Sequence, residues 1–271
     1  MDEVTVSRAR ALWEELAGGR FPDRGGVRVL QTTTSRLCPP GWAGMVMLAG
    51  AVLANAPTAA QAALLREALL DAASREAALL AAASRGAAPP DVTVPGAAPR
   101  EAARLDTGSL PVRDALGPAA LAYLAPGDFQ SYGDERPEDP ERPAPGVEWA
   151  GPAEIAGLLA TVDPAEANES GLDGLPRAAV VRVGGRVVAA SGYDRWPAGT
   201  AHLCVLTATG HRGRGHATRV AAVATADALA AGLLPQWRAQ VLASRRVADK
   251  LGYRVLGQQR SLLLADQGDG P

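Results

Sequence analysis

The chain has very little cysteine. Only Cys38 and Cys204 occur among its 271 residues, too few for a disulfide framework and in keeping with a reducing compartment. The first residues, MDEVTVSRAR, also lack the apolar segment of a secretory signal peptide. From these two features we expect a cytoplasmic protein.

Long apolar runs and an excess of basic residues are missing as well. The most apolar stretch, MVMLAGAVLANA at 45–56, is shorter than the roughly 20 residues of a membrane-spanning helix. The net charge is −2, whereas nucleic-acid-binding proteins are normally basic. The front half clusters no His, Cys or carboxylate residues. We therefore expect no membrane contact, no nucleic-acid partner and no metal site.

Two proline-rich stretches divide a chain whose 47% hydrophobic content can fill a core for each part. The segment at 87–100, AAPPDVTVPGAAPR, cannot hold a regular ladder, and GDERPEDPERPAPG at 133–146 alternates charge with proline, which favours an extended, solvated tether. The predicted organisation is an N-terminal α+β domain of unknown role at 1–132, a linker at 133–146 and a second domain at 147–271.

The N-terminal part has the pattern of a helix, strands and a second helix. Residues 7–16 have amphipathic spacing, and VRVLQ at 27–31 and the run at 44–56, broken near Gly50, are typical of strands. Thr58 with Gln61 forms a capping box before TAAQAALLREALL. None of this indicates a particular activity.

The C-terminal part alternates helices and strands around one unusual turn. A Gly184-Gly185 pair suits the positive φ angles of a tight hairpin, and Ser244 is placed to cap a last helix that ends at Gly252. The predicted elements are helices at 152–161, 164–170, 216–231 and 244–251, a hairpin at 177–193, and strands at 201–208, 235–242 and 253–264.

The turn between the strand at 201–208 and the following helix reads GHRGRGHA. Free amides at a helix N-terminus and the positive end of the helix dipole favour an anion. Gly213 and Gly215 let a ligand approach the backbone, and Arg212 and Arg214 add positive charge. A phosphate or diphosphate site is therefore predicted, with a plain surface turn or a nucleic-acid contact as the alternatives. Thr218 stands where the third glycine of a dinucleotide fingerprint would be.

The order of elements and two motifs resemble the GCN5-related N-acetyltransferase (GNAT) superfamily over about residues 145–267. Arg212, Gly215 and Ala217 fit that family's Q/R-x-x-G-x-G/A diphosphate motif, and LGY at 251–253 is similar to its L-G-F. The resemblance implies an α/β (α+β) protein whose C-terminal domain is a mixed, mostly antiparallel sheet flanked by helices.

The resemblance also implies acetyl-coenzyme A as co-substrate and direct transfer of its acetyl group to an amine. The coenzyme's pantetheine would pair with the backbone of Val205, Leu206 and Thr207, where strand 201–208 separates from strand 235–242. Ser244 would hydrogen-bond near the coenzyme. The diphosphate would lie on the residues of the glycine-rich loop, which are Arg212, Gly213, Arg214, Gly215, His216 and Ala217.

The acid and the base of the reaction are less evident. The family's usual tyrosine acid falls at Ala248, and its upstream asparagine falls at Val241. His202, on the central strand, and Glu169, on a short helix, are the candidate bases, although His202 is out of phase with Leu203 and each has a structural alternative.

Two further functions stay open. One is a non-catalytic protein that binds coenzyme A through a degenerate GNAT domain, and the other is a protein or peptide N-acetyltransferase. A small-molecule amine is the expected partner, and a homodimer is compatible with the sequence.

Overall fold

The computed structural model describes residues 2–84, 110–131 and 146–265. The predicted linker, apart from Gly146, and the proline-rich stretch at 87–100 lie outside the described residues. Within them, no helix is long and apolar enough to cross a membrane. The chain forms two compact units, residues 10–121 with 256–271 and residues 1–9 with 122–255.

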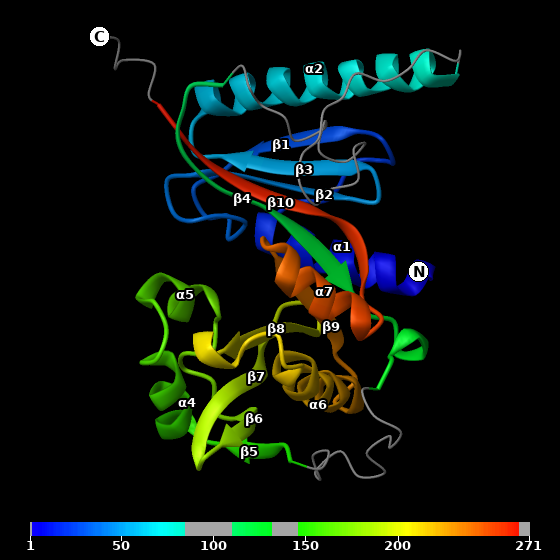
Figure 1. The fold of residues 1–271 in the computed structure, drawn as a ribbon. Coiled ribbons are helices and arrows are strands. Elements are labelled where there is room, and N and C mark those ends of the chain that lie inside the picture. Colours follow the sequence, from blue (N-terminus) through cyan, green and yellow to red (C-terminus); the bar gives the residue numbers. More distant parts are fainter. Residues whose placement is uncertain (1, 85–109, 132–145, 266–271) are drawn as a thin grey trace. The chain divides into compact units, whose positions relative to one another are not determined.

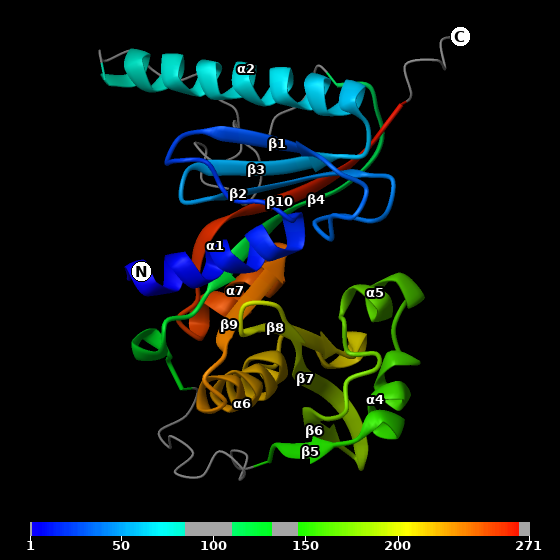
Figure 2. The ribbon, with the colours of Figure 1, turned by 180° about the vertical axis from the view of Figure 1, so that it is seen from behind.

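The first unit contains a sheet with the strand order β1-β3-β2-β10-β4. Its β1 pairs in parallel with β3, whereas β2 is antiparallel to both β3 and β10. The long helix α2 packs along β1 and β3 (Figure 2). The elements are α1 Glu3–Ala17 (from Arg10), β1 Val27–Gln31, β2 Ala43–Leu48, β3 Ala51–Ala56, α2 Ala59–Ser84, β4 Val112–Tyr123 (to Leu121) and β10 Arg254–Leu264 (from Leu256).

Local signals predicted several features of this unit correctly. The run at 44–56 is two strands joined at Ala49 and Gly50, which have φ angles of 48° and 83°. The hydroxyl of Thr58 accepts the Gln61 amide at 3.2 Å, as an N-cap does. The α2 helix continues well beyond the predicted segment because its alanine-rich sequence contains no helix breaker before Ser84.

The second unit contains β5 to β9 and the end of β4, in the order β4-β9-β8-β7-β6-β5. Neighbours from β5 to β8 are antiparallel, and β8 pairs with β9 in parallel. The elements are η2 Pro126–Asp128, β5 Glu148–Ala150, α4 Pro152–Leu159, α5 Pro164–Glu169, β6 Ala178–Val183, β7 Arg186–Trp196, β8 Thr200–Thr207, η3 Thr209–His211, α6 His216–Ala230, β9 Leu234–Ala239 and α7 Leu242–Lys250.

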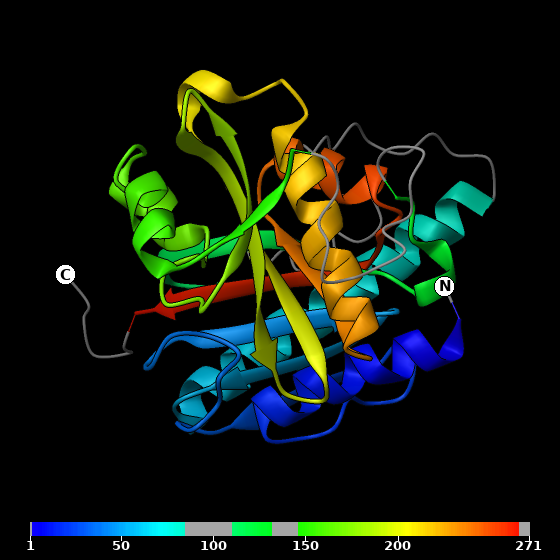
Figure 3. The same cartoon turned by 90° about the horizontal axis from the view of Figure 1, so that it is seen from below.

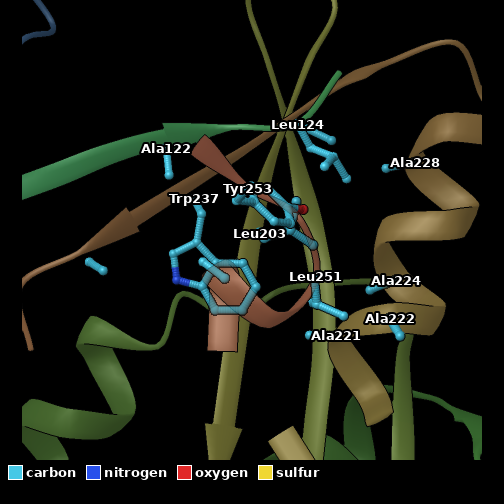
Figure 4. Packing of buried hydrophobic residues seen from close by; sticks show 13 residues of the cluster. Ala122, Leu124, Leu203, Ala221, Ala222, Ala224, Ala228, Trp237, Leu251 and Tyr253 are labelled. Carbon is cyan, nitrogen blue, oxygen red and sulfur yellow. The ribbon is translucent and has the colours of Figure 1, made fainter. Parts of the chain in front are cut away.

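Helices cover the two faces of this sheet (Figures 1 and 3). On one face, Ile155 and Leu158 of α4 pack with Cys204 and Leu206 of β8. On the other, alanines of α6 pack with Leu203, and the indole of Trp237 meets the ring of Tyr253 edge-on at 5.5 Å (Figure 4). The expected mixed, mostly antiparallel sheet flanked by helices is therefore present.

The compact units differ from the predicted division at 133–146 because they are discontinuous in sequence. Residues 257–262 of β10 pair with 43–48 of β2, so the C-terminal strand belongs to the first unit. Nothing in the local pattern of YRVLGQQRSLLL indicates which sheet it joins, since strand pairing is a long-range choice.

Candidate functional site

A cavity of about 550 Å³ lies in the second unit. Residues of α5, of β8 and the loop after it, of the end of β9 and of α7 line it. These elements bring together segments that are far apart in sequence.

The cavity begins where β8 and β9 separate. The two strands pair at Thr200–Leu234, Ala201–Pro235 and His202–Gln236, and within the described chain no further pair follows. The predicted gap between these strands is thus present. Beyond it, Leu203 and Val205 of β8 and Trp237 and Ala239 of β9 line the cavity.

The edge of β8 toward this gap carries free backbone groups. The amide of Ala208 donates to Val188 on β7, so the alternation of an antiparallel ladder turns the polar groups of Val205 and the amide of Thr207 toward the opposite edge, past the last pair of β8 with β9. Leu206 also lines the cavity, but the same alternation directs its backbone to β7. Of the predicted pantetheine contacts, the geometry favours Val205 and Thr207 over Leu206.

The glycine-rich loop forms the start of α6. Gly213 and Gly215 have φ angles of 73° and 82°, and Gly215 is the N-cap residue, with no side chain bonded to the helix end. Within the described chain, none of the amides of residues 213–218 donates to a backbone carbonyl. Such a set of free donors at a helix N-terminus suits an anion.

Three polar side-chain atoms near this loop also lack partners. Thr207 Oγ1, His211 Nδ1 and His216 Nδ1 are buried, and none has a hydrogen-bond partner among the described residues. All three residues line the cavity. Because buried polar groups are nearly always paired, these atoms fit a ligand that brings hydrogen-bonding groups of its own.

The two loop arginines differ. The Arg212 guanidinium donates from Nε to the Thr207 carbonyl at 3.1 Å and from NH2 to Glu166 Oε1 at 2.5 Å. Arg214 is exposed and is not among the residues that line the cavity. Of the two, only Arg212 is placed to contact a ligand there, whereas Arg214 contributes charge from the surface.

His202 lines the cavity from the face of β8 that α4 covers. Its Nδ1 lies 2.5 Å from Oε1 of Gln236, and the indole of Trp196 stacks on the imidazole with ring centroids 4.0 Å apart. Burial, opposed by the hydrogen bond to Gln236, lowers the pKa of His202 to about 4. The side chain is therefore a neutral imidazole at neutral pH.

Glu169 lies at the end of α5 and is half-exposed. Its Oε1 accepts a hydrogen bond from Gln240 Nε2 at 3.2 Å and lies 3.7 Å from NH2 of Arg238. Both carboxylates of α5 thus contact residues across the cavity, Glu166 on the loop and Glu169 on the β9 side.

Ser244 lines the cavity but does not cap the last helix, so that prediction was wrong. The α7 helix begins two residues earlier, at Leu242, and the Ser244 hydroxyl accepts the indole N–H of Trp237 at 2.9 Å. The hydroxyl proton remains available to another acceptor. Ala248, at the position of the family's tyrosine, is buried in the core cluster with Trp237 and Tyr253.

Both cysteines are unsuited to catalysis. Burial raises the pKa of the Cys204 thiol to about 12, and its side chain packs among the apolar residues against α4. Burial likewise raises the pKa of Cys38, in the other unit. A thiol that stays protonated is a poor nucleophile.

Residues 179–259 match the family model for GNAT acetyltransferases. This segment is similar to GNAT acetyltransferases. It holds β6 to β9, the glycine-rich loop, α6 and α7, and therefore most of the residues that line the cavity.

Several solved structures resemble the chain. They include a protein from Novosphingobium aromaticivorans assigned to the GNAT family (23% identity, 56% of this chain and 65% of that one, TM-score 0.41). Others are an acetyltransferase from the GNAT family of Colwellia psychrerythraea (13%, 60% and 60%, 0.41) and a GCN5-related N-acetyltransferase from Kribbella flavida (22%, 55% and 58%, 0.36). This chain spans less than two thirds of each of them, and no curated protein matches it.

Three residues of the site, Glu166, Gln236 and Trp237, were not predicted from the sequence. Gln236 could have been suspected as a polar residue in a strand whose neighbours are apolar. The contacts of Glu166 and Trp237 depend on how α5 and α7 pack, which the sequence pattern does not reveal.

Proposed function

We propose that this protein is an acetyl-coenzyme A-dependent N-acetyltransferase that acetylates an amine of a small molecule by direct transfer in a ternary complex. One observation carries the proposal. Within the GNAT domain, the open edge of β8 and the free amides of 213–218 border the same cavity. An extended, amide-containing chain that ends in a diphosphate matches both features.

The residues fit the two parts of the coenzyme in different ways. The amides of 213–218, with His216 and Arg212 beside them, suit the diphosphate. The backbone of Val205 and Thr207 suits the amides of pantetheine. Arg246 and Lys250 also line the cavity and favour a polyanion there.

Direct transfer is favoured over an acyl-enzyme because neither cysteine is a usable nucleophile. The amine nitrogen attacks the thioester carbonyl carbon, the carbon–sulfur bond breaks, and the nitrogen loses one proton while the sulfur gains one. Backbone N–H groups on the open edge of β8 are suitable donors for the oxyanion, and the Ser244 hydroxyl is a suitable donor for the departing sulfur.

The low pKa of His202 restricts its role. Full proton transfer from an alkylammonium of pKa about 10 to an imidazole of pKa about 4 is uphill by roughly six pKa units, or about 8 kcal/mol. His202 is better suited to accept a proton from the amine nitrogen after that nitrogen has attacked the thioester, because it is then far more acidic. The amine would then enter uncharged or lose its first proton to water, with Glu169 as the other candidate base at the cavity.

A thiol-release screen tests the proposal. The protein is incubated with acetyl-coenzyme A and a panel of polyamines, aminoglycosides, amino acids and peptides, and coenzyme affinity is measured separately by calorimetry. Release with a small amine supports the proposal. Release with peptides alone supports the peptide N-acetyltransferase alternative. Coenzyme binding without release from any amine supports a non-catalytic coenzyme-binding protein, and absence of binding contradicts all three.

A further inference from the structure

We propose that Gln236 is a positioning residue for acetyl transfer, which holds His202 in the tautomer with a proton on Nδ1 and a lone pair on Nε2. The inference rests on the proposed function for its catalytic meaning, since Nε2 is the nitrogen left to serve a reacting amine. The assignment of the tautomer itself rests on the contacts around His202.

The contact lies where β8 and β9 part. His202 and Gln236 form the last backbone pair of the two strands, and their side chains meet on the same face. Gln236 is fully buried, with no exposed side-chain surface. The imidazole is thus held at Nδ1 by Gln236 and on one ring face by Trp196, at the end of the cavity.

The identity of the facing atom determines the tautomer. Gln236 presents Oε1 to the imidazole, and a carbonyl oxygen only accepts hydrogen bonds. The Nδ1 atom must therefore carry the proton, and in a neutral ring Nε2 then carries the lone pair. Nε2 is the ring nitrogen that remains for a molecule in the cavity that His202 lines.

An amide suits this role better than a carboxylate would. A carboxylate at position 236 would stabilise the imidazolium and remove the lone pair, whereas an amide orients the ring without adding charge. The other charged groups around His202 are Asp194, its pair on β7, which favours the protonated ring, and Arg238 on β9, which opposes it. Arg238 in turn contacts Glu169 of α5. The balance of these groups with burial keeps the ring neutral.

Packing alone does not account for a glutamine at this position. Its Nε2 is buried and has no hydrogen-bond partner among the described residues, and the Thr200 hydroxyl on β8 is buried without a partner as well. An unpaired buried amide group lowers stability, so an apolar side chain would serve a purely structural role at least as well. The hydrogen bond to His202 is the interaction that an amide side chain supplies and an apolar side chain does not.

Nuclear magnetic resonance of the full chain tests the tautomer directly. The chain has only three histidines, so ring-nitrogen signals of ¹⁵N-histidine-labelled protein can be assigned to His202 with the His202→Ala variant. We expect the unmodified protein to show a neutral His202 with its proton on Nδ1 at neutral pH. A proton on Nε2, or a charged ring, would overturn the proposal.

Two variants then test the role of Gln236. Gln236→Glu should raise the pKa of His202 by roughly 1 unit or more and move the acidic limb of the kcat/KM profile upward by the same amount. Gln236→Leu should mix the tautomers and lower kcat on the order of tenfold while KM for the coenzyme stays constant. Gln31→Glu, on β1 in the other unit, is the matched control.

The outcomes separate this inference from the proposed function. An Nδ1-protonated His202 whose tautomer is unchanged in folded Gln236→Leu would show that Gln236 does not position the ring. If Gln236→Leu alters the tautomer but neither it nor His202→Ala changes kcat, the positioning of the ring stands while its catalytic purpose is refuted. If no amine is acetylated at all, the spectra still decide the contact.

Discussion

Arg212 of the glycine-rich loop is paired with Glu166 of α5, with NH2 and Oε1 2.5 Å apart. The Glu166 carboxylate forms an ion pair with this guanidinium, which borders the same cavity as the free amides of the loop. Glu166 therefore takes the place of an anion on Arg212. If the coenzyme binds at this loop as proposed, its binding and the position of α5 are linked through this one contact.

Glu166→Gln should tighten coenzyme binding, because the diphosphate no longer competes with a carboxylate for Arg212. Both side chains are nearly half-exposed, so the pair is worth at most about 1 kcal/mol, or roughly fivefold in Kd. Calorimetry measures the change. Glu154→Gln, which removes a carboxylate from Arg182 away from the cavity, is the control and should leave Kd unaltered. Weaker coenzyme binding by the Glu166→Gln variant would mean that Glu166 stabilises the coenzyme site and does not compete with the diphosphate.

Gly215→Glu should abolish coenzyme binding. Gly215 has a φ angle of 82°, and the side chain would add both backbone strain and negative charge beside the free amides. The control is Gly210→Glu, in the preceding turn, where an added Cβ meets nothing within 4 Å and φ is not positive. Unchanged affinity of a folded Gly215→Glu protein would rule out the anion site.

The activity should rise with pH through the pKa of His202, about 4, when the acceptor is an amine that is uncharged in that range. Because burial depresses this pKa, the basic form of the imidazole predominates above it and is lost only in strong acid. His202→Ala should remove this limb and lower kcat by about 10² or more, while coenzyme affinity is retained. Glu169→Ala should retain the limb. If both variants keep the original profile and rate, deprotonation runs through water and neither residue is the base.

Coenzyme binding should take up protons at His216. Burial, and then the nearby Arg219, His211 and Arg214, lower its pKa in the free protein. A bound diphosphate would favour the charged ring and raise that pKa. Kd should therefore increase as the pH rises between the two pKa values. Calorimetry in two buffers of different ionisation enthalpy should detect the uptake, and His216→Asn should eliminate it, whereas His202→Ala should not.

Ala248→Tyr should destabilise the fold rather than supply the missing acid. Ala248 is 2% exposed and packs in the cluster with Trp237 and Tyr253, so the larger ring would overpack it, typically at a cost of about 1–3 kcal/mol. Val247 lines the cavity instead. In thermal unfolding, Val247→Tyr should lower Tm less than Ala248→Tyr. An unchanged Tm for Ala248→Tyr would show that this part of the core has room.

Features with a local cause were predictable from the sequence. Gly184 and Gly185 have φ angles of 58° and 79° in the turn of the β6–β7 hairpin, as a two-glycine turn implies. The helix after the loop begins at His216, and Gly232 follows its end with a φ angle of 71°. In each case a few adjacent residues decide the backbone conformation.

The spacing of the motif residues also predicted the similarity to the GNAT family. The spacing of Arg212, Gly215 and Ala217, followed by LGY at 251–253, indicated a GNAT domain that the family model then matched at residues 179–259. Ser244 shows the limit of such reasoning. Its hydroxyl suits a helix cap, but Trp237 reaches it from another strand and the helix starts elsewhere.

The amino-acid sequence determined most of the helices and strands, the glycine-rich turn and the similarity to the GNAT family, because these depend on residues that are neighbours along the chain. Only the tertiary structure decided that β10 pairs in the first unit, that Glu166 meets Arg212 and that Gln236 faces His202. The last two contacts join residues that are 46 and 34 positions apart in the chain, respectively. Strand pairing and helix packing set such contacts, and they depend on the burial of whole faces rather than on any local pattern.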